Sequence, residues 1–578
     1  MKLAARSLLL FTALGATIAS AQTQTHNIPQ IQHVIVVVQE NRTPDNLFGS
    51  DAFNSQPQLP GADLVQTGLC SQSQNPITLQ SIMLGDHCDP SHGHKHSWVP
   101  TYNSGNMNGA CTIGMQGCTK SDPEYTYVDE TEADPYFQIA KQYGYANYMF
   151  QTSQGPSFPA HQFLLSGTSA PDYFGDTNSN CGTEDPDCWH WFAAENANVR
   201  GAPYGCTATS TVVMEIDSAG NESNGYLNGY PCYTHNTLAT LLDNNKITWK
   251  YYAHAASLQP SNPATSLWTA PNAISGICVP VPVPGGSVAC TGGEWNSNVV
   301  AVFPYASNYP NSYSPILTDL GVDPNQPQCS LPAVSWVVPD GAWSDHGGED
   351  TNNGGPDWVT AIVNAVGGGY TNKGKQLKDC GYWKNTVILI TWDDWGGWYD
   401  HILPLNCGPG PNGTCSGYPN STGNWYVYGF RVPLLVVSAY NVHGTGSYKG
   451  YISGACYPPN CPNKQPPYVH DFGSILNFIE YAFGQNGKPL GGTGGISPSY
   501  PYADWYAPDG PFVCGAKCAQ PYSLGDFFNF GNQATTFTPF TITNGYGTEC
   551  FIVPSGTGCF GSNFTPSDPD DDNVDVQD

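Results

Sequence analysis

Residues 33–42 read His-Val-Ile-Val-Val-Val-Gln-Glu-Asn-Arg, an apolar run that ends abruptly in polar side chains. An apolar run without alternation is typical of a strand that is buried on both faces of its sheet. Similar runs follow at residues 333–338, 386–392 and 432–438. Because parallel sheets are covered on both faces, these runs predict a central sheet that is mostly parallel.

Helical patterns lie between or after these runs, at residues 136–143, 237–244, 358–366 and 473–483. Alternation of strands and helices predicts an α/β fold, a three-layer α/β/α sandwich around the sheet. The remaining stretches, about 50–130, 175–230, 255–330 and 403–465, are dominated by Gly, Pro, Asn and Ser. They contain many Tyr, Trp and Cys residues, so we expect long ordered loop insertions rather than disorder.

The two ends of the chain differ from its middle. Residues 1–21 combine Lys2 and Arg6, a short apolar run and a small-residue pattern that ends at Ala21. This indicates a signal peptide cleaved after Ala21, and the apolar run is too short for a membrane anchor. We therefore expect a secreted or periplasmic protein with one large domain at 22–565 and a flexible acidic tail at 566–578.

The chain has 20 cysteines, an even number that predicts disulfides in an exported protein. Many are neighbours in sequence, which favours local pairing, although sequence does not determine connectivity. The expected local pairs are 70 with 88, 111 with 118, 181 with 188, 407 with 415, 456 with 461, 514 with 518 and 550 with 559.

The charge is strongly acidic, with 46 Asp and Glu against 18 Lys and Arg, a formal net charge of -28. Such a surface repels nucleic acid and anionic membranes and suits an acidic medium. If the substrate carries a phosphate, a local cation must overcome this field, which favours a bound metal over a basic patch.

Carboxylates gather just after two of the predicted strands. Glu40 and Asn41 follow the first run, and Asp393 and Asp394 follow the third. Ligands in such sheets bind beyond the carboxyl ends of the strands, so these four side chains could supply hard oxygen ligands to a divalent cation of unknown identity. The alternative is that they are ordinary turn residues.

Histidines and one serine are the other candidates for chemistry. His92, His94 and His96 occupy alternate positions in one segment, which could form a zinc site or a solvated loop. His346 and His401 follow other predicted strands. Ser157 lies between Pro156 and Pro159 before a helical stretch, where it could be a nucleophile or a helix N-cap.

Several segments together resemble the phosphoesterase family of bacterial phospholipases C and acid phosphatases, which has an alkaline phosphatase-like fold. The similar segments are Glu-Asn-Arg-Thr-Pro-Asp at 40–45, Asp-Pro-Ser-His at 89–92, Gly-Pro-Ser-Phe-Pro at 155–159, Ser-Asp-His at 344–346 and Asp-Asp-Trp-Gly-Gly-Trp-Tyr-Asp-His at 393–401. This chain departs from the family at Trp395 and Phe472, where histidine is usual, and at His161–Gln162.

The resemblance implies a metal held by Glu40, Asn41, Asp393, Asp394 and Ser157, with Ser157 as the nucleophile that forms a phosphoserine intermediate. It also implies catalytic roles for Asn41, His92 or His94, His346 and His401, with histidine as the proton donor and an acidic pH optimum.

The implied substrate is a small phosphate ester, as for an acid phosphatase, with the phospholipid headgroup of a phospholipase C as the alternative. We expect no nucleic acid partner and no stable membrane anchor. Two other functions also fit the composition: a secreted glycosidase that uses paired carboxylates, and a non-catalytic binding protein.

Overall fold

The computed structural model describes most of the chain between His26 and Ile542. The described ranges are 26–169, 192–196, 205–208, 213–216, 222–223, 231–256, 259–284, 288–302, 314–322, 329–348, 354–368, 371–372, 375–376, 378–404, 428–444, 448–454, 468–492, 495–497, 502–514, 518, 520–542. The predicted signal peptide and acidic tail lie outside these ranges. In the described part no helix is both long and apolar enough to cross a membrane.

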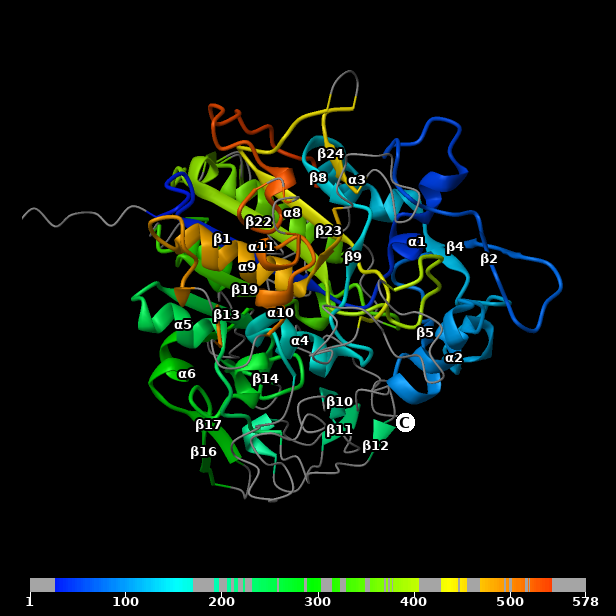
Figure 1. Ribbon diagram of the computed structural model, residues 1–578, viewed down its shortest axis with the longest axis horizontal. Helices are drawn as coiled ribbons and strands as arrows, with labels where there is room; N and C mark the ends of the chain where they lie inside the picture. The colour runs from blue at the N-terminus through cyan, green and yellow to red at the C-terminus, as the bar shows by residue number, and fades with distance from the viewer. Residues whose placement is uncertain are drawn as a thin grey trace, which may run out of the picture.

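An eight-stranded sheet crosses the centre of the molecule (Figure 1). In spatial order its strands are β18 (Val299–Ala301), β13 (Trp249–Ala253), β19 (Val334–Val337), β1 (His33–Gln39), β22 (Thr386–Trp392), β23 (Leu434–Ser438), β8 (Gly144–Ala146) and β24 (Tyr451–Ser453). The four predicted apolar runs form the adjacent strands β19, β1, β22 and β23. Within this sheet β23 is antiparallel to both neighbours and the other pairs are parallel, so the sheet is mostly parallel as expected.

All four predicted helices are present. They are α3 (Glu130–Gln142), α5 (Leu238–Asn244), α8 (Gly354–Val366) and α9 (Phe472–Phe483). The start of α3 lies six residues before the prediction because Asp129 caps it by accepting a hydrogen bond from the Thr131 backbone. Two further helices matter below, α4 (Ser157–Ser166) and α10 (Ala503–Tyr506).

Helices cover both faces of the sheet. Trp336 pairs in register with Val36 of β1, whereas Trp392 pairs with Gln39, so the two indoles point to opposite faces. Trp336 Nε1 donates to the Leu164 carbonyl of α4 at 3.0 Å. On the other face, the ring of Tyr136 in α3 packs edge-on against Trp392 at 5.0 Å. The helix α4 therefore lies against one face and α3 against the other.

The connection between β1 and α3 forms a separate region, blue in Figure 1 and at the right of the view. Its short strands are β2 (Thr67–Gly68), β3 (Ile77–Thr78), β4 (Gln80–Ile82), β5 (Asp89–Pro90), β6 (Met115–Gln116) and β7 (Thr126–Val128), and its helices include α1 (Pro44–Leu47) and α2 (Val99–Tyr102). The remaining described strands and helices are short: β9 (Met149–Phe150), β10 (Phe192–Asn196), β11 (Val213–Ile216), β12 (Glu222–Ser223), β14 (Ala255–Ala256), β15 (Gln259–Pro263), β16 (Val279–Pro282), β17 (Val288–Thr291), β20 (Thr371–Asn372), β21 (Lys375–Gln376), β25 (His470–Asp471), α6 (Gly293–Asn298), α7 (Pro315–Asp319) and α11 (Pro511–Cys514).

Disulfides join these loops, but not all in the predicted pattern. The expected pairs 70 with 88 and 111 with 118 are wrong: the bonds are Cys70–Cys111 and Cys88–Cys118. The pairing of β5, which follows Cys88, with β6, which precedes Cys118, brings these two cysteines together although they are 30 positions apart. The pair Cys514–Cys518 is confirmed. Other bonds are Cys206–Cys232, Cys278–Cys290 and Cys329–Cys380. The expected pairs 181 with 188, 407 with 415, 456 with 461 and 550 with 559 lie outside the described residues.

Candidate active site

Two strand ends bring the predicted carboxylates together. Because β1 and β22 are parallel and Gln39 is in register with Trp392, the residues that follow them lie side by side. The Asp393 backbone N–H donates to the Gln39 carbonyl at 3.0 Å. The Asn41 backbone N–H donates to Asp393 Oδ1 at 3.0 Å, and Asn41 adopts the left-handed φ of 57° that turns the chain at this edge. The predicted convergence of these segments is confirmed.

A cradle of three side chains is buried at this edge: Glu40, Asp393 and His161. One donor atom from each lies within 4.8 Å of the other two. His161 Nε2 lies 3.4 Å from Glu40 Oε1 and 3.6 Å from Asp393 Oδ2. Among the described residues, neither His161 Nε2 nor Asp393 Oδ2 has a hydrogen-bond partner. We call these three residues the cation cradle.

The cation cradle fits a divalent metal. Two carboxylates and one imidazole suit first-row divalent ions, and a bound cation would satisfy buried atoms that otherwise lack hydrogen bonds. Burial raises the pKa of Asp393, but the neighbouring imidazole of His161 outweighs burial, and the net shift is downward. Asp393 is therefore ionised, the form that a metal ligand requires.

His161 was not among the predicted site residues. It stands at one of the positions where this chain departs from the family, yet it lies in α4 one turn after Ser157, on the same helix face. Its i, i+4 spacing from the candidate nucleophile was the signal that could have found it.

Ser157 faces the same group of side chains. Its Oγ donates to Asp394 Oδ2 at 3.2 Å and lies 3.5 Å from Asn41 Oδ1. The alternative role as a helix N-cap does not apply, because Ser157 is the first residue of α4 and Pro156 holds the cap position. The positive end of the helix dipole is therefore at Ser157, where it favours an anion such as a phosphate.

The structure separates the three alternating histidines. His92 is buried, with Nδ1 bonded to the Pro90 carbonyl at 2.8 Å and Nε2 bonded to Asn41 Nδ2 at 2.9 Å. His94 is also buried and its Nε2 lies 3.3 Å from Gln154 Oε1, while His96 is exposed. The His346 ring lies 5.4 Å from the His92 ring, centroid to centroid. His92 is thus beside the Asn41 side chain, His346 packs against His92, and His96 faces solvent.

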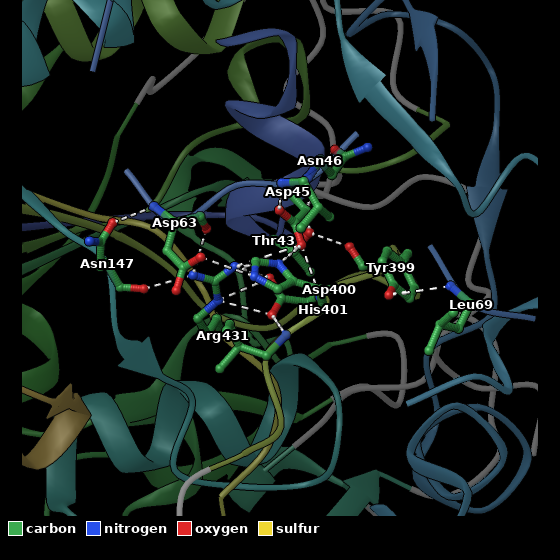
Figure 2. A network of polar contacts seen from close by, with 12 residues as sticks. Thr43, Asp45, Asn46, Asp63, Leu69, Asn147, Tyr399, Asp400, His401 and Arg431 are labelled. Atoms are coloured by element: carbon green, nitrogen blue, oxygen red, sulfur yellow. Dashed lines mark hydrogen bonds and ion pairs between the residues drawn. The ribbon is translucent and has the colours of Figure 1, made fainter. Parts of the chain in front are cut away.

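His401 lies in a different polar network, shown in Figure 2. Its Nδ1 lies 2.6 Å from Asp45 Oδ2 and its Nε2 lies 3.2 Å from Asp63 Oδ1. Arg431 forms a bidentate pair with Asp400 and lies 3.7 Å from Asp45, so a guanidinium already supplies the positive charge among these carboxylates. Both ring nitrogens of His401 face carboxylates, which is the arrangement of a structural ion pair. The expected catalytic role is not supported by this position.

The pKa of His401 reflects this environment. Burial alone would lower it, but Asp45 and Asp63 outweigh burial and raise it to about 9. Arg431 precedes β23 and Asp400 follows β22. Because these two strands are antiparallel, the start of β23 and the end of β22 lie at the same edge of the sheet. The network therefore ties the loop after β22 to the loop before β23.

Comparison with known proteins identifies the family. The model of the Phosphoesterase family matches residues 31–485, which begin just before β1 and include the cation cradle, Ser157 and His92. The chain belongs to the phosphoesterase family. It is therefore a hydrolase that acts on phosphoric ester bonds, and the glycosidase and binding-protein alternatives are set aside.

Several curated relatives of this phosphoesterase are phospholipases C. Phospholipase C B of Mycobacterium tuberculosis strain H37Rv is 24% identical over 450 residues, covering 72% of this chain and 70% of that protein. Phospholipase C A of the same strain is 30% identical over 119 residues, 19% of this chain and 21% of that protein. Non-hemolytic phospholipase C of Pseudomonas aeruginosa strain PAO1 is 22% identical over 511 residues, 82% of this chain and 57% of that protein.

Proposed function

We propose that this phosphoesterase is an exported, metal-dependent acid phosphatase that uses Ser157 as its nucleophile. The observation that carries the proposal is the position of Ser157 Oγ, 3.2 Å from Asp394 and on the same helix as His161 of the cation cradle. The helices on the two faces of the sheet support an alkaline phosphatase-like α/β/α sandwich. The apolar run before Ala21 supports export by a cleaved signal peptide.

The cation would be held by Glu40, Asp393 and His161 of the cation cradle. The resemblance implies Asn41, Asp394 and Ser157 as further ligands. When bound, the cation would supply positive charge that lowers the pKa of the Ser157 hydroxyl and attracts the phosphoryl oxygens. This positive charge compensates for the acidity of the rest of the chain.

The protein's own groups account for the proton transfers. The Ser157 hydroxyl lies 3.2 Å from Asp394 Oδ2, which would receive its proton as Oγ attacks phosphorus and the bond to the leaving oxygen breaks. Asn41 Nδ2 and the N-terminus of α4 stabilise charge on the phosphoryl oxygens. In the second step water attacks phosphorus and gives a proton to the histidine that protonated the leaving oxygen, the Oγ–phosphorus bond breaks, and Ser157 Oγ takes its proton back from Asp394.

The leaving oxygen takes a proton from a histidine. His346 keeps Nδ1 on the Gly347 carbonyl at 2.6 Å, so proton exchange falls to its Nε2. The His92 ring lies next to the His346 ring and can act as a second proton donor. Histidine is protonated below about pH 6.5, which gives the proposed enzyme an acidic optimum.

Phospholipase C activity is the second candidate, favoured by the three relatives named above. The strongly negative chain disfavours docking on anionic bilayers, so a monoester in solution is the first choice. A phospholipase C would act on a zwitterionic headgroup instead.

The test is hydrolysis of p-nitrophenyl phosphate and p-nitrophenyl phosphorylcholine by the mature protein between about pH 4 and 8, with and without EDTA. The proposal expects chelator-sensitive release from the monoester, fastest in acid. Faster release from phosphorylcholine would favour the phospholipase C. No release from either substrate after metal is restored would contradict both.

A further inference from the structure

The Gln151 side chain links the two loops that supply Ser157 and Asp394. Gln151 follows β9 and is fully buried. Its backbone is held by the segment before β23, since its N–H donates to the Phe430 carbonyl at 3.2 Å and its carbonyl accepts from the Gly429 N–H at 3.0 Å. The backbone of Gln151 is therefore fixed independently of its side chain.

Three hydrogen bonds fix the Gln151 amide. Its Nε2 donates to the Ser153 carbonyl at 2.8 Å and to the Gly155 carbonyl at 3.1 Å. Its Oε1 accepts from the Trp395 backbone N–H at 3.1 Å. The opposite orientation of the amide would place an oxygen against two carbonyls, so each end has a defined partner.

The hydrogen-bond partners of the Gln151 amide lie in the two loops that carry Ser157 and Asp394. Ser153 and Gly155 lead directly into Pro156 and Ser157, while Trp395 directly follows Asp394. The two loops are far apart in sequence, and Asp394 is itself oriented by the Gly396 N–H, which donates to its Oδ1 at 2.7 Å. The amide of Gln151 thus bridges the nucleophile loop to the carboxylate that faces the nucleophile.

Gly429 leaves the space that this side chain occupies. A Cβ at residue 429 would lie 2.3 Å from Gln151 Cγ and 2.2 Å from the Ser153 carbonyl oxygen. A side chain there would displace Gln151 or the nucleophile loop. Residue 429 therefore gives a second way to disturb the bridge without changing the amide.

We propose that Gln151 is a positioning residue that holds Ser157 Oγ in line for attack by fixing its loop to the loop of Asp394. The inference rests on the proposed role of Ser157. Displacing a reacting group by about 1 Å can cost about 100-fold in rate, so the effect should fall on kcat while KM changes little.

The experiment compares four variants of the full-length mature enzyme on p-nitrophenyl phosphate: Gln151→Met, Gln151→Glu, Gly429→Ala and Ser157→Ala. Gln151→Met and Gly429→Ala should lower kcat by about 100-fold with KM changed less than about threefold. Gln30→Glu is the matched control for Gln151→Glu, because Gln30 Nε2 also donates to a backbone carbonyl, that of Phe530 at 2.9 Å, in a part-buried position away from these loops. It should leave kcat unchanged.

The pH profile distinguishes positioning from a loss of folding. Gln151→Glu keeps the shape of the side chain but replaces the donor with an acceptor. When protonated in acid, the introduced carboxyl group can donate again to Ser153 or Gly155, so kcat relative to wild type should recover at least about tenfold between pH 7 and 4.5. Gln151→Met should show no such recovery.

Two outcomes would overturn the inference, and they differ from failure of the proposed function. Suppose that Ser157→Ala is inactive while the Gln151 variants are soluble, folded and keep the wild-type kcat. The Gln151 bridge then does not position Ser157. If the Gln151 variants lose thermal stability and Gln151→Glu shows no recovery in acid, Gln151 is structural only. Wild-type activity in Ser157→Ala would instead remove the proposed function itself.

Discussion

Ser157 Oγ lies 3.2 Å from Asp394 Oδ2 although 237 positions separate the two residues. The contact arises because α4 begins at Ser157 against one face of the sheet, while β22 ends at Trp392 just before the carboxylates. Both segments reach the edge where β1 also ends. The chemistry proposed for this phosphoesterase depends on that meeting point.

Removal of the cation should both inactivate and destabilise the protein. Without it, the buried carboxylates of Glu40 and Asp393 repel each other. We expect EDTA to lower Tm and abolish hydrolysis, and a divalent metal to restore both. His161→Ala should weaken metal affinity by at least about tenfold, measured by calorimetric titration.

The matched control for that variant is His443→Ala, because His443 is an exposed histidine outside the cation cradle. It should bind metal as the wild type does. Unchanged affinity in His161→Ala would remove His161 from the cation cradle.

The three alternating histidines should differ sharply in function. His92 contacts Asn41, and its loss removes this hydrogen bond together with the proposed proton-transfer group. We expect His92→Ala to lower kcat by about 10²–10⁴ and His96→Ala, at the exposed position, to leave it within about twofold. Steady-state kinetics on p-nitrophenyl phosphate measures both. Equal effects of the two substitutions would show that the assignment of His92 is wrong.

His401 should contribute to stability rather than to chemistry. Its pKa is raised from 6.5 to about 9 by Asp45 and Asp63 acting against burial. The stabilisation is therefore fully present below about pH 6.5 and is lost as pH rises through about 9. His401→Gln should lower the free energy of unfolding by about 1–3 kcal/mol at pH 6, with a smaller difference at pH 10.

Urea unfolding at the two pH values measures this difference. If His401→Gln instead keeps wild-type stability at pH 6 and loses phosphoserine formation, the residue has a catalytic role after all.

A buried carboxyl pair should make the protein less stable as pH rises. Glu480 of α9 and Asp504 of α10 form a buried carboxyl pair. Burial raises the pKa of Asp504 to about 6, although hydrogen bonds from backbone N–H groups and from Glu480 act against it. Burial, followed by the negative charge of Asp504, raises the pKa of Glu480 well above its ordinary value. Stability is then greatest below the ordinary carboxyl pKa of about 4 and is lost as pH rises through about 6.

Glu480→Gln should remove much of this loss. It should raise the free energy of unfolding at pH 8 by about 1–3 kcal/mol and have little effect at pH 4.5. Asp379→Asn, at an exposed carboxylate, is the control and should not alter the slope. A wild-type Tm that is flat between pH 5 and 8 would contradict the prediction.

The sequence predicted the sheet better than it predicted the connections. The continuous apolar runs at β1, β19, β22 and β23 could be recognised because burial on both faces removes alternation. The reversed direction of β23 could not be predicted, because buried strands have the same composition whether they are parallel or antiparallel. The pairings of Cys70 and Cys88 failed for a similar reason: they depend on how a long loop folds back.

The candidate site was predicted in its carboxylates and its serine, because strand ends and a stiff proline-flanked loop leave local signals. His161 was missed because its role depends on the helix that starts at Ser157. Gln151 had no sequence signal, since its three partners come from loops that only the fold brings together. The contacts of His401 with Asp45 and Asp63 had no sequence signal either, because the network with Arg431 is a property of the tertiary structure.

The most direct test of the proposed mechanism is to trap the phosphoserine intermediate. The enzyme is mixed at about pH 5 with p-nitrophenyl phosphate that is labelled in its phosphoryl group. The reaction is quenched in acid within one turnover, and the protein is digested and analysed by mass spectrometry. We expect one phosphoryl group on Ser157 of the wild type and none on that peptide in Ser157→Ala. An active enzyme that carries no phosphoryl group on Ser157, or carries it on another residue, would contradict the proposed mechanism.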